Sequence, residues 1–347
     1  MVLAKKLFAK IFAFFVVSKI KKSYPHAAQI QTNTLKDLLN KAKKTKFGTE
    51  HQFNEINCVE EFTDKVPVRD YEEIKKYIDE IKKGSEDVLW PGKPKYLAKT
   101  SGTTSGVKYI PITNESMPNH ILSSRNALLF YIYETGDTSF LNGKTIFLQG
   151  SPVLDEINGI LFGRLSGIVA HHIPSYLKKN NLPSFKTNSI EDWEEKINEI
   201  CSETINENMT TIGGIPSWVQ MYFEILLKKS NKKNITELFK NLSLYVYGGV
   251  NFYPYEKIFS KLLGKKINTI EYYPASEGFF AYQNSQTDRS LLLQYNSGIF
   301  YEFIRTDEFE SDNYTRYNLT NVDKGVNYIL VITSNAGLWA YNTGDTV

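Results

Sequence analysis

The sequence contains few features of secreted or metal-binding proteins. Only two cysteines, Cys58 and Cys201, occur among 347 residues, and neither has a metal-ligand spacing. A disulfide framework is thereby excluded, and we expect both thiols to be packing residues in a reducing compartment. An excess of one charge is also lacking, because 41 basic residues balance 38 acidic ones. The overall charge of the chain therefore gives no indication of nucleic acid binding.

A long hydrophobic run is absent as well. Residues 3–20 are rich in apolar side chains, but lysines interrupt them, and the longest uncharged run, Ile11–Ser18, is too short to span a membrane. Lysines, and not a small-residue cleavage site, follow this segment at residues 19–22. We therefore expect no membrane span and a cytoplasmic location. The segment is either a helix packed on its own protein or one that lies on a membrane surface.

Two further absences limit the choice of enzyme class. No G-x-G-x-x-G follows an early strand, which argues against an oxidoreductase that binds a dinucleotide. No internal repeat or low-complexity linker interrupts the chain, so we expect one continuous unit. A hydrophobic content of 41% and a charged content of 23% are typical of globular proteins.

The pattern of apolar residues predicts an α/β fold. Residues 29–45 have helical periodicity and Gly48 is expected to end that helix, while Asp70 is placed to cap a helix that runs to about Lys83. Short apolar strands then alternate with helices, which is typical of layered α/β subdomains. The strands are expected at residues 96–99, 109–112, 145–149, 210–212, 244–247 and 267–272, and the helices at 192–206 and 216–228.

From residue 291 to 347 the sequence becomes dense in aromatic and β-branched residues separated by turns, which predicts a mostly antiparallel subdomain. We therefore divide a single large domain, 1–347, into a helical lead-in (1–95), α/β subdomains (96–290) and this mostly β subdomain (291–347).

The first candidate functional segment is a loop of glycines and hydroxyl residues between two expected strands. Glycines let backbone N–H groups converge on an oxyanion, hydroxyls add donors, and Lys108 adds positive charge. The segment is not a nucleoside-triphosphatase P-loop, because Val107 follows Gly106 and no Ser or Thr follows Lys108. It is either a phosphate-binding loop or a flexible turn. Its residues are Ser101, Gly102, Thr103, Thr104, Ser105, Gly106 and Lys108.

The second segment, residues 271–278, follows an expected strand of the α/β sheet. Ligands collect at the carboxyl ends of such strands, and the Glu277 carboxylate is a suitable ligand for Mg²⁺ bound to phosphates. The alternative is that Ser276 or Glu277 caps a helix, with the glutamate in solvent.

The third segment is residues 338–347. Asp345 follows Gly344 and is able to accept two hydrogen bonds from the vicinal hydroxyls of a ribose. The alternative is an ordinary hairpin turn at Thr-Gly-Asp.

In this order the three segments resemble the phosphate-loop, Mg²⁺ and ribose motifs of the adenylate-forming enzymes. The sequences at residues 98–111, 66–71 and 87–92 are similar to those of the auxin-responsive promoter (Gretchen Hagen) family of acyl acid amido synthetases, in its bacterial form. The resemblance implies a ligase that uses ATP and Mg²⁺ to activate a small carboxylic acid as an acyl-adenylate, which an amino acid amine then captures. It implies Lys108 and Glu277 as catalytic residues, Glu277 as metal ligand, and nucleotide contacts from the loop and from Gly248, Gly249, Tyr273, Ala275, Ser276, Tyr341 and Asp345.

The sequence also departs from the family. Asn342 stands where an arginine is common, and the smaller C-terminal domain that closes over the family's site is expected to be absent here. An acyl-CoA ligase and a truncated, non-catalytic nucleotide-binding module are therefore retained as alternatives. On the superfamily layout, the candidates for the acid pocket are Gly163, Arg164, Trp218, Met221 and Tyr222, although 218–223 has the spacing of a core helix. His171 and His172 are expected to be structural neighbours on one strand.

Overall fold

The computed structural model describes residues 2–101, 106–173, 178–311 and 314–347. Five α-helices form the N-terminal part, and two of them, α3 and α5, begin with a side-chain cap. The cap of α5 is the clearest, because the Asp70 side chain accepts from the Glu73 N–H while the Glu73 side chain accepts from the Asp70 N–H. The five helices are α1 (Val2–Ser23), α2 (Ala27–Ala42), α3 (Lys46–Glu50), α4 (Val59–Lys65) and α5 (Tyr71–Lys82).

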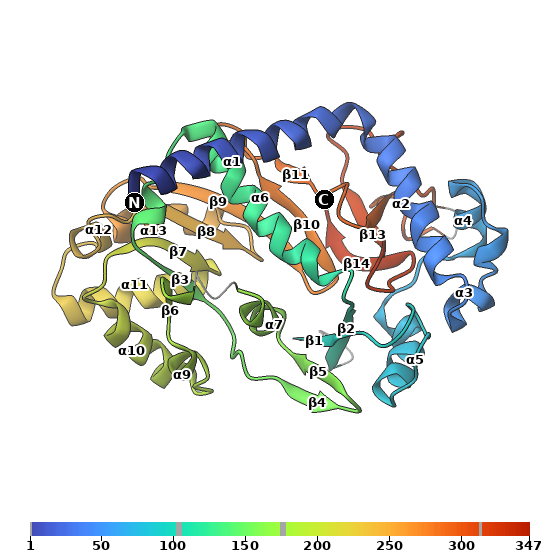
Figure 1. Cartoon of the computed structure of the whole chain (residues 1–347), viewed down its shortest axis with the longest axis horizontal. Coiled ribbons are helices and arrows are strands. Elements are labelled where there is room, and N and C mark those ends of the chain that lie inside the picture. Colours follow the sequence, from blue (N-terminus) through green and yellow to red (C-terminus); the bar gives the residue numbers. More distant parts are fainter. Residues whose placement is uncertain (1, 102–105, 174–177, 312–313) are drawn as a thin grey trace.

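A seven-stranded sheet forms the centre of the molecule, in the order β11-β10-β9-β8-β7-β3-β6 (Figure 1). The strands from β9 to β6 are parallel, whereas β10 and β11 are antiparallel at one edge. The strands are β3 (Lys144–Leu148), β6 (Asn181–Leu182), β7 (Met209–Gly214), β8 (Leu244–Gly248), β9 (Asn268–Ala275), β10 (Gly278–Gln283) and β11 (Leu291–Leu293).

Helices cover both faces of this sheet, and β8 shows why. Tyr245 and Tyr247 belong to the apolar cluster beneath the helices α10 to α13, while Leu244 and Val246 belong to the cluster that contains residues of α1 and α6. Alternate side chains of a strand point to opposite faces, so a strand buried on both sides is apolar throughout. These helices are α6 (Met117–Thr135), α10 (Trp193–Thr204), α11 (Pro216–Ser230), α12 (Ile235–Leu238) and α13 (Glu256–Leu263).

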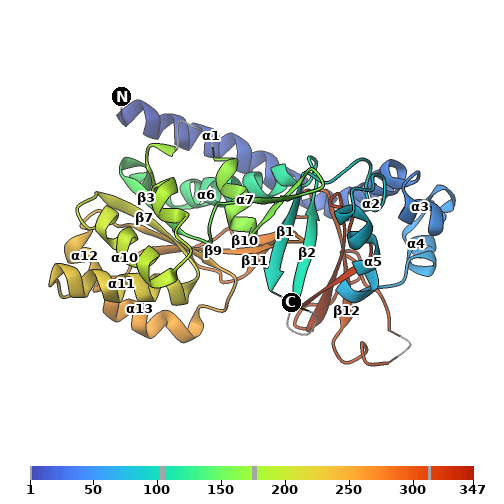
Figure 2. The ribbon, with the colours of Figure 1, turned by 90° about the horizontal axis from the view of Figure 1, so that it is seen from below.

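Two smaller sheets lie to one side of the central one, on the right in Figure 2. The first has the order β2-β1-β5-β4, and the second, β12-β13-β14, is fully antiparallel. One apolar cluster joins both small sheets to the helical lead-in. Their strands are β1 (Tyr96–Ser101), β2 (Val107–Ile112), β4 (Asp155–Ile157), β5 (Ile160–Gly163), β12 (Ile299–Arg305), β13 (Tyr328–Ser334) and β14 (Tyr341–Thr346), and two short helices are α7 (Leu165–His171) and α9 (Phe185–Asn188).

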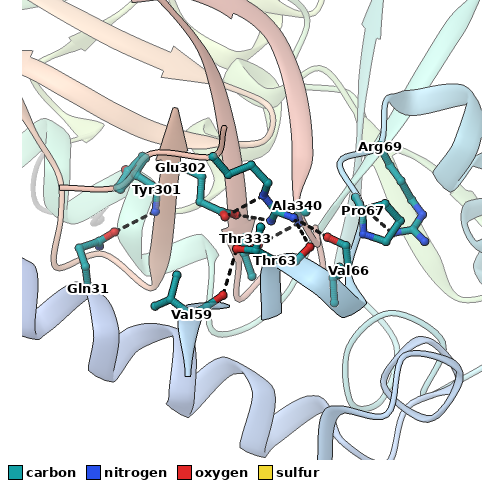
Figure 3. Close-up of polar contacts among 11 residues, drawn as sticks. Gln31, Val59, Thr63, Val66, Pro67, Arg69, Tyr301, Glu302, Thr333 and Ala340 are labelled. Carbon is teal, nitrogen blue, oxygen red and sulfur yellow. Dashed lines mark hydrogen bonds and ion pairs between the residues drawn. The ribbon is translucent and has the colours of Figure 1, made fainter. Parts of the chain in front are cut away.

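A buried ion pair fastens the lead-in to the three-stranded sheet (Figure 3). The Arg316 guanidinium donates to both carboxylate oxygens of Glu302, at 2.9 and 2.7 Å. It also donates to the carbonyls of Thr63 and Val66, at 3.2 and 2.6 Å. The two charged side chains are only 4% and 1% exposed, so each depends on the other to satisfy its charge.

The α/β class and the antiparallel C-terminal strands are confirmed, whereas two local predictions are wrong. Gly48 does not end a helix: α2 ends at Ala42, and Gly48 lies inside α3, where its N–H donates to the side chain of the capping residue Thr45. His171 and His172 lie at the C-terminal end of α7 and not on a strand. Their role is structural, because the His172 ring bonds the Tyr96 hydroxyl at 3.0 Å and the His171 ring bonds the Pro152 carbonyl at 2.7 Å.

Candidate active site

The loop expected to bind phosphate joins β1 to β2. The two strands are antiparallel, and Ser101 pairs with Val107 at the end of the hairpin where the connection begins. Gly102, Thr103 and Thr104 lie outside the described residues, and only the backbone of Ser101 is described. Gly106 has a φ of +83°, a left-handed conformation that favours glycine.

Lys108 lies on β2 opposite Thr100. Its ammonium lies 5.5 Å from the centre of the Tyr71 ring, and the Tyr71 hydroxyl accepts from the Tyr109 N–H at 2.9 Å. Tyr71 is the first residue of α5, directly after the cap Asp70. The start of α5 thus supports the strand that carries the lysine.

Glu277 lies in the tight turn between β9 and β10, where Ala275 pairs with Gly278. Strand β9 extends through Ala275, so Ser276 and Glu277 form a hairpin turn and do not cap a helix. Glu277 is partly buried. Its pKa is raised to about 7, chiefly by burial; a backbone hydrogen bond lowers the pKa, the nearby Asp345 carboxylate raises it, and the Lys108 ammonium lowers it. The structure therefore brings both Asp345 and Lys108 within electrostatic reach of Glu277.

A wide bulge in β14 presents Asp345. Asn342 pairs with Val331 and Thr346 pairs with Ile329, so β14 has extra residues between two pairs. The Asn342 side chain accepts from the Gly344 N–H at 2.9 Å, which gives this residue a local structural role. The strand with its bulge replaces the simple hairpin turn that we considered.

The exposed Asp345 carboxylate accepts from the Tyr273 hydroxyl of β9 at 2.6 Å. Burial and this hydrogen bond raise the pKa of Tyr273, so the hydroxyl remains a donor. The bond joins the three-stranded sheet directly to the central sheet. One carboxylate oxygen thus fixes the orientation of Asp345 and leaves the other oxygen for a ligand.

Tyr341 is buried at the start of β14, near the β9–β10 turn that contains Glu277. Burial, followed by the Glu277 charge, raises the pKa of its hydroxyl. Its neighbours hold the lead-in in place, because the Arg69 N–H donates to the Ala340 carbonyl at 3.0 Å and the Asn342 N–H donates to the Arg69 carbonyl at 2.8 Å. Residues 69–71 therefore contact both β14 and β2. The sequence motif at 66–71 includes these residues, but it does not predict that they contact both strands.

Gly248 and Gly249 end β8 next to β9. A Cβ on Gly248 would lie 2.4 Å from the Tyr272 carbonyl oxygen, so any side chain would separate the two strands. Gly249 has a φ of +81°, which again favours glycine. The chain therefore leaves the sheet close to the β9 residues that precede Glu277.

The residues suggested for an acid pocket have different environments. Tyr222 is fully buried in the core, and its hydroxyl donates to Thr204 at 2.7 Å. Trp218 packs on Trp193 with ring centres 4.6 Å apart, and the Trp193 indole N–H contacts the Met221 sulfur at 3.0 Å. Gly163 and Arg164 lie at the junction of β5 and α7. Tyr222 is a core residue, as its helical spacing also allowed.

The charge arrangement is suited to a phosphate ligand that carries a hard cation. Within the described residues, no group of three His, Cys, Asp or Glu side chains is placed to hold a metal alone. A single carboxylate such as Glu277 fits Mg²⁺, which keeps several waters and takes its other ligands from phosphates. Lys108 supplies a compact positive charge from β2 of the four-stranded sheet.

Tyr273→Phe tests the link between the two sheets. Loss of a hydroxyl that donates to a carboxylate is expected to weaken nucleotide binding about tenfold, because Asp345 loses its fixed orientation. Calorimetric titration with MgATP measures the change. Tyr253→Phe is the control, since Tyr253 is 70% exposed on η4 (Tyr253–Tyr255). Equal affinities for all three proteins would show that the bond has no role in binding.

Comparison with solved structures identifies the architecture. The fold is similar to that of GH3.15 acyl acid amido synthetase in complex with 2,4-DB, with a TM-score of 0.78 and 17% identity over 95% of this chain and 66% of that one. It is also similar to 2-hydroxyisobutyryl-CoA ligase in complex with 2-HIB-AMP and CoA, with a TM-score of 0.59 and 12% identity over 90% of this chain and 68% of that one. The fold is that of the large domain of adenylate-forming enzymes.

Sequence comparison identifies the family. The GH3 family N-terminal domain matches residues 16–181, and the GH3 family central domain matches residues 292–347, together more than half of the chain. A stretch of 111 residues is 34% identical to indole-3-acetic acid-amido synthetase GH3.15 of Arabidopsis thaliana, over 31% of this chain and 18% of that protein. The chain belongs to the GH3 family. It spans 66% of the length of the solved GH3.15 chain.

Proposed function

We propose that this chain binds ATP with Mg²⁺ between the β1–β2 loop, the β9–β10 turn and the β14 bulge, and that it takes part in the ATP-dependent joining of a carboxylic acid to an amino acid. The observation that carries the proposal is the convergence of Lys108, Glu277 and Asp345 from three sheets. Membership of the GH3 family supports ATP use and the two substrate classes. The sequences of the motifs at 66–71 and 98–111 support membership of the bacterial form of the family.

The first step joins the acid to the nucleotide. A carboxylate oxygen of the acid attacks the α-phosphorus of ATP, the bond from that phosphorus to the bridging oxygen breaks, and pyrophosphate leaves with the electron pair. Both reactants are anions, so catalysis requires positive charge and fixed orientation. Lys108 and the loop amides would stabilise charge on the phosphates, Glu277 would hold the Mg²⁺ that accompanies them, and Asp345 would bind the ribose.

The second step releases AMP. The amine nitrogen of an amino acid attacks the acyl carbon, the bond from carbon to the AMP oxygen breaks, and the nitrogen loses a proton to solvent to give the amide. No protein side chain becomes a covalent nucleophile. Gly248, Gly249, Ala275, Ser276 and Tyr341 would border the nucleotide, because they lie on the segments that surround Glu277.

Two other functions are compatible with the same first step or the same pocket. The similarity of the fold to 2-hydroxyisobutyryl-CoA ligase leaves coenzyme A as an alternative acceptor. A nucleotide-binding module without turnover is the second alternative. Thioester formation with added coenzyme A would identify the first, and binding of MgATP without pyrophosphate exchange would identify the second.

Lys108→Ala tests the proposal. We expect pyrophosphate exchange, measured with a panel of carboxylic acids, to fall about a hundredfold or more, because one charge that stabilises the transition state is removed. Lys99→Ala is the matched control. Lys99 is an exposed lysine on β1 that pairs with Tyr109, so it points to the opposite face of the sheet from Lys108. Exchange that survives at full rate in Lys108→Ala would remove this residue from the mechanism.

A further inference from the structure

The N-terminal helix α1 packs on the protein by one face only. Ala13 and Val17 are fully buried there, in a cluster shared with α6 and with residues of β8, β9 and β10. Ala9, Val16 and Ile20 pack partly buried against the same cluster. In Figures 1 and 2, α1 lies along an outer edge of the molecule with α6 on its inner side. This inner face confirms the packed-helix interpretation.

The outer face of α1 is nevertheless also apolar. At 100° per residue, Phe8, Ile11 and Phe15 lie nearly opposite Ala13 and Val17. Phe8 is 69% exposed and Phe15 is 66% exposed. Such a concentration of large apolar side chains on a surface marks an interaction site. The outer apolar face consists of Leu7, Phe8, Ile11, Phe12, Phe14 and Phe15, all exposed.

The charges on α1 are all positive. The helix contains no acidic residue between Val2 and Ser23, whereas its lysines are Lys5, Lys6, Lys10, Lys19, Lys21 and Lys22. Lys5 and Lys10 lie between the outer apolar face and the packed face, and the Lys5 ammonium donates to the Leu141 carbonyl at 3.1 Å. Arg125 of α6 adds a cation 5.7 Å from the Phe12 ring. Cations therefore border the exposed phenylalanines on both sides of the helix.

We infer that the outer apolar face of α1 binds the surface of a lipid bilayer that contains anionic lipids. Helices that lie in the interface insert phenylalanine and leucine side chains among the acyl chains, while flanking lysines reach the anionic headgroups. The helix does not cross the bilayer: no helix of the described residues is long and apolar enough to do so. α1 lies in the plane of the membrane surface.

The positive charge of α1 favours a membrane over a second copy of this chain as the partner of the outer apolar face. A symmetric contact through the outer apolar face would place two helices rich in lysine against each other, with no acidic side chain on either one to compensate. An anionic surface compensates the same charge. Figure 2 shows the C-terminus, two residues after Asp345, on the side of the molecule away from α1, so a membrane bound to α1 would not cover Asp345.

Sedimentation with vesicles tests this inference independently of catalysis. We expect the chain to sediment with phosphatidylcholine vesicles that contain phosphatidylglycerol, and to bind pure phosphatidylcholine vesicles and vesicles in high salt far more weakly. Phe8→Ser and Phe15→Ser are each expected to weaken binding about tenfold. Phe185→Ser is the matched control, because Phe185 is 63% exposed on α9. Circular dichroism checks that the three variants keep the fold.

Two results would overturn the inference. In the first, the chain stays in the supernatant with anionic vesicles, or the α1 variants sediment as the unchanged chain does. In the second, sedimentation velocity shows a dimer that Phe8→Ser dissociates, which would assign the outer apolar face to a second copy. A pyrophosphate exchange rate that Phe8→Ser leaves unchanged is expected either way, because α1 contributes no residue to the candidate active site.

Discussion

Glu277→Gln is expected to lower pyrophosphate exchange about a hundredfold at pH 8, because the amide is a poor ligand for the Mg²⁺ that accompanies ATP. The wild-type rate should depend on pH in a defined way. Since the pKa of Glu277 is raised to about 7, protonation removes the carboxylate below that pH. MgATP affinity should therefore approach a tenfold loss per pH unit below 7, and Glu277→Gln should abolish this dependence.

The same substitution should stabilise the protein without ligand. The pKa of Glu277 rises from 4.5 to about 7 on folding, so the favourable contribution of the protonated form is complete below 4.5 and is lost as the pH increases through 7. Glutamine carries no charge to desolvate. Thermal unfolding of Glu277→Gln should thus occur at a higher temperature than wild type at pH 8, with a smaller difference at pH 5. A lower temperature at pH 8 would contradict the desolvation of this carboxyl group in the folded protein.

Arg316→Ala is expected to lower the free energy of unfolding by about 3–5 kcal/mol, because it leaves the Glu302 carboxylate buried without a partner. It also removes the donor to the Thr63 and Val66 carbonyls. Urea unfolding followed by tryptophan fluorescence measures the change.

The control replaces both charges. Arg316→Met combined with Glu302→Leu should cost less than Arg316→Ala alone, since no isolated charge remains. A single variant as stable as wild type would show that the pair is exposed in solution. Because Val66 precedes the residues that bridge β14 and β2, the single variant should also weaken MgATP binding, whereas a purely local role would leave the affinity unchanged.

Local signals were sufficient for much of the fold. The helix α5 was predicted from Asp70 because its capping box lies within four residues, and the strands of the central sheet were predicted from short apolar runs. The prediction that Gly48 ends a helix is wrong because glycine also occurs inside helices, at places where the chain passes close to other backbone. A Cβ there would lie 2.2 Å from the Ala42 carbonyl oxygen.

The candidate site depends on contacts that are distant in the sequence. Tyr273 and Asp345 are separated by 72 residues, and no pattern around either one indicates their hydrogen bond. The bulge that presents Asp345 follows from how β14 pairs with β13, which the Thr-Gly-Asp sequence does not specify. Similarly, periodicity did not show which apolar face of α1 is covered, because the helix is apolar on both. These features require the assembled sheets.

A crystal structure of the chain with MgATP or a non-hydrolysable analogue would test whether the three segments form a single nucleotide pocket. We expect a nucleotide whose phosphates lie between Lys108 and Glu277, and whose ribose contacts Asp345. A nucleotide bound elsewhere on the molecule, with Glu277 and Asp345 free of contact, would contradict it.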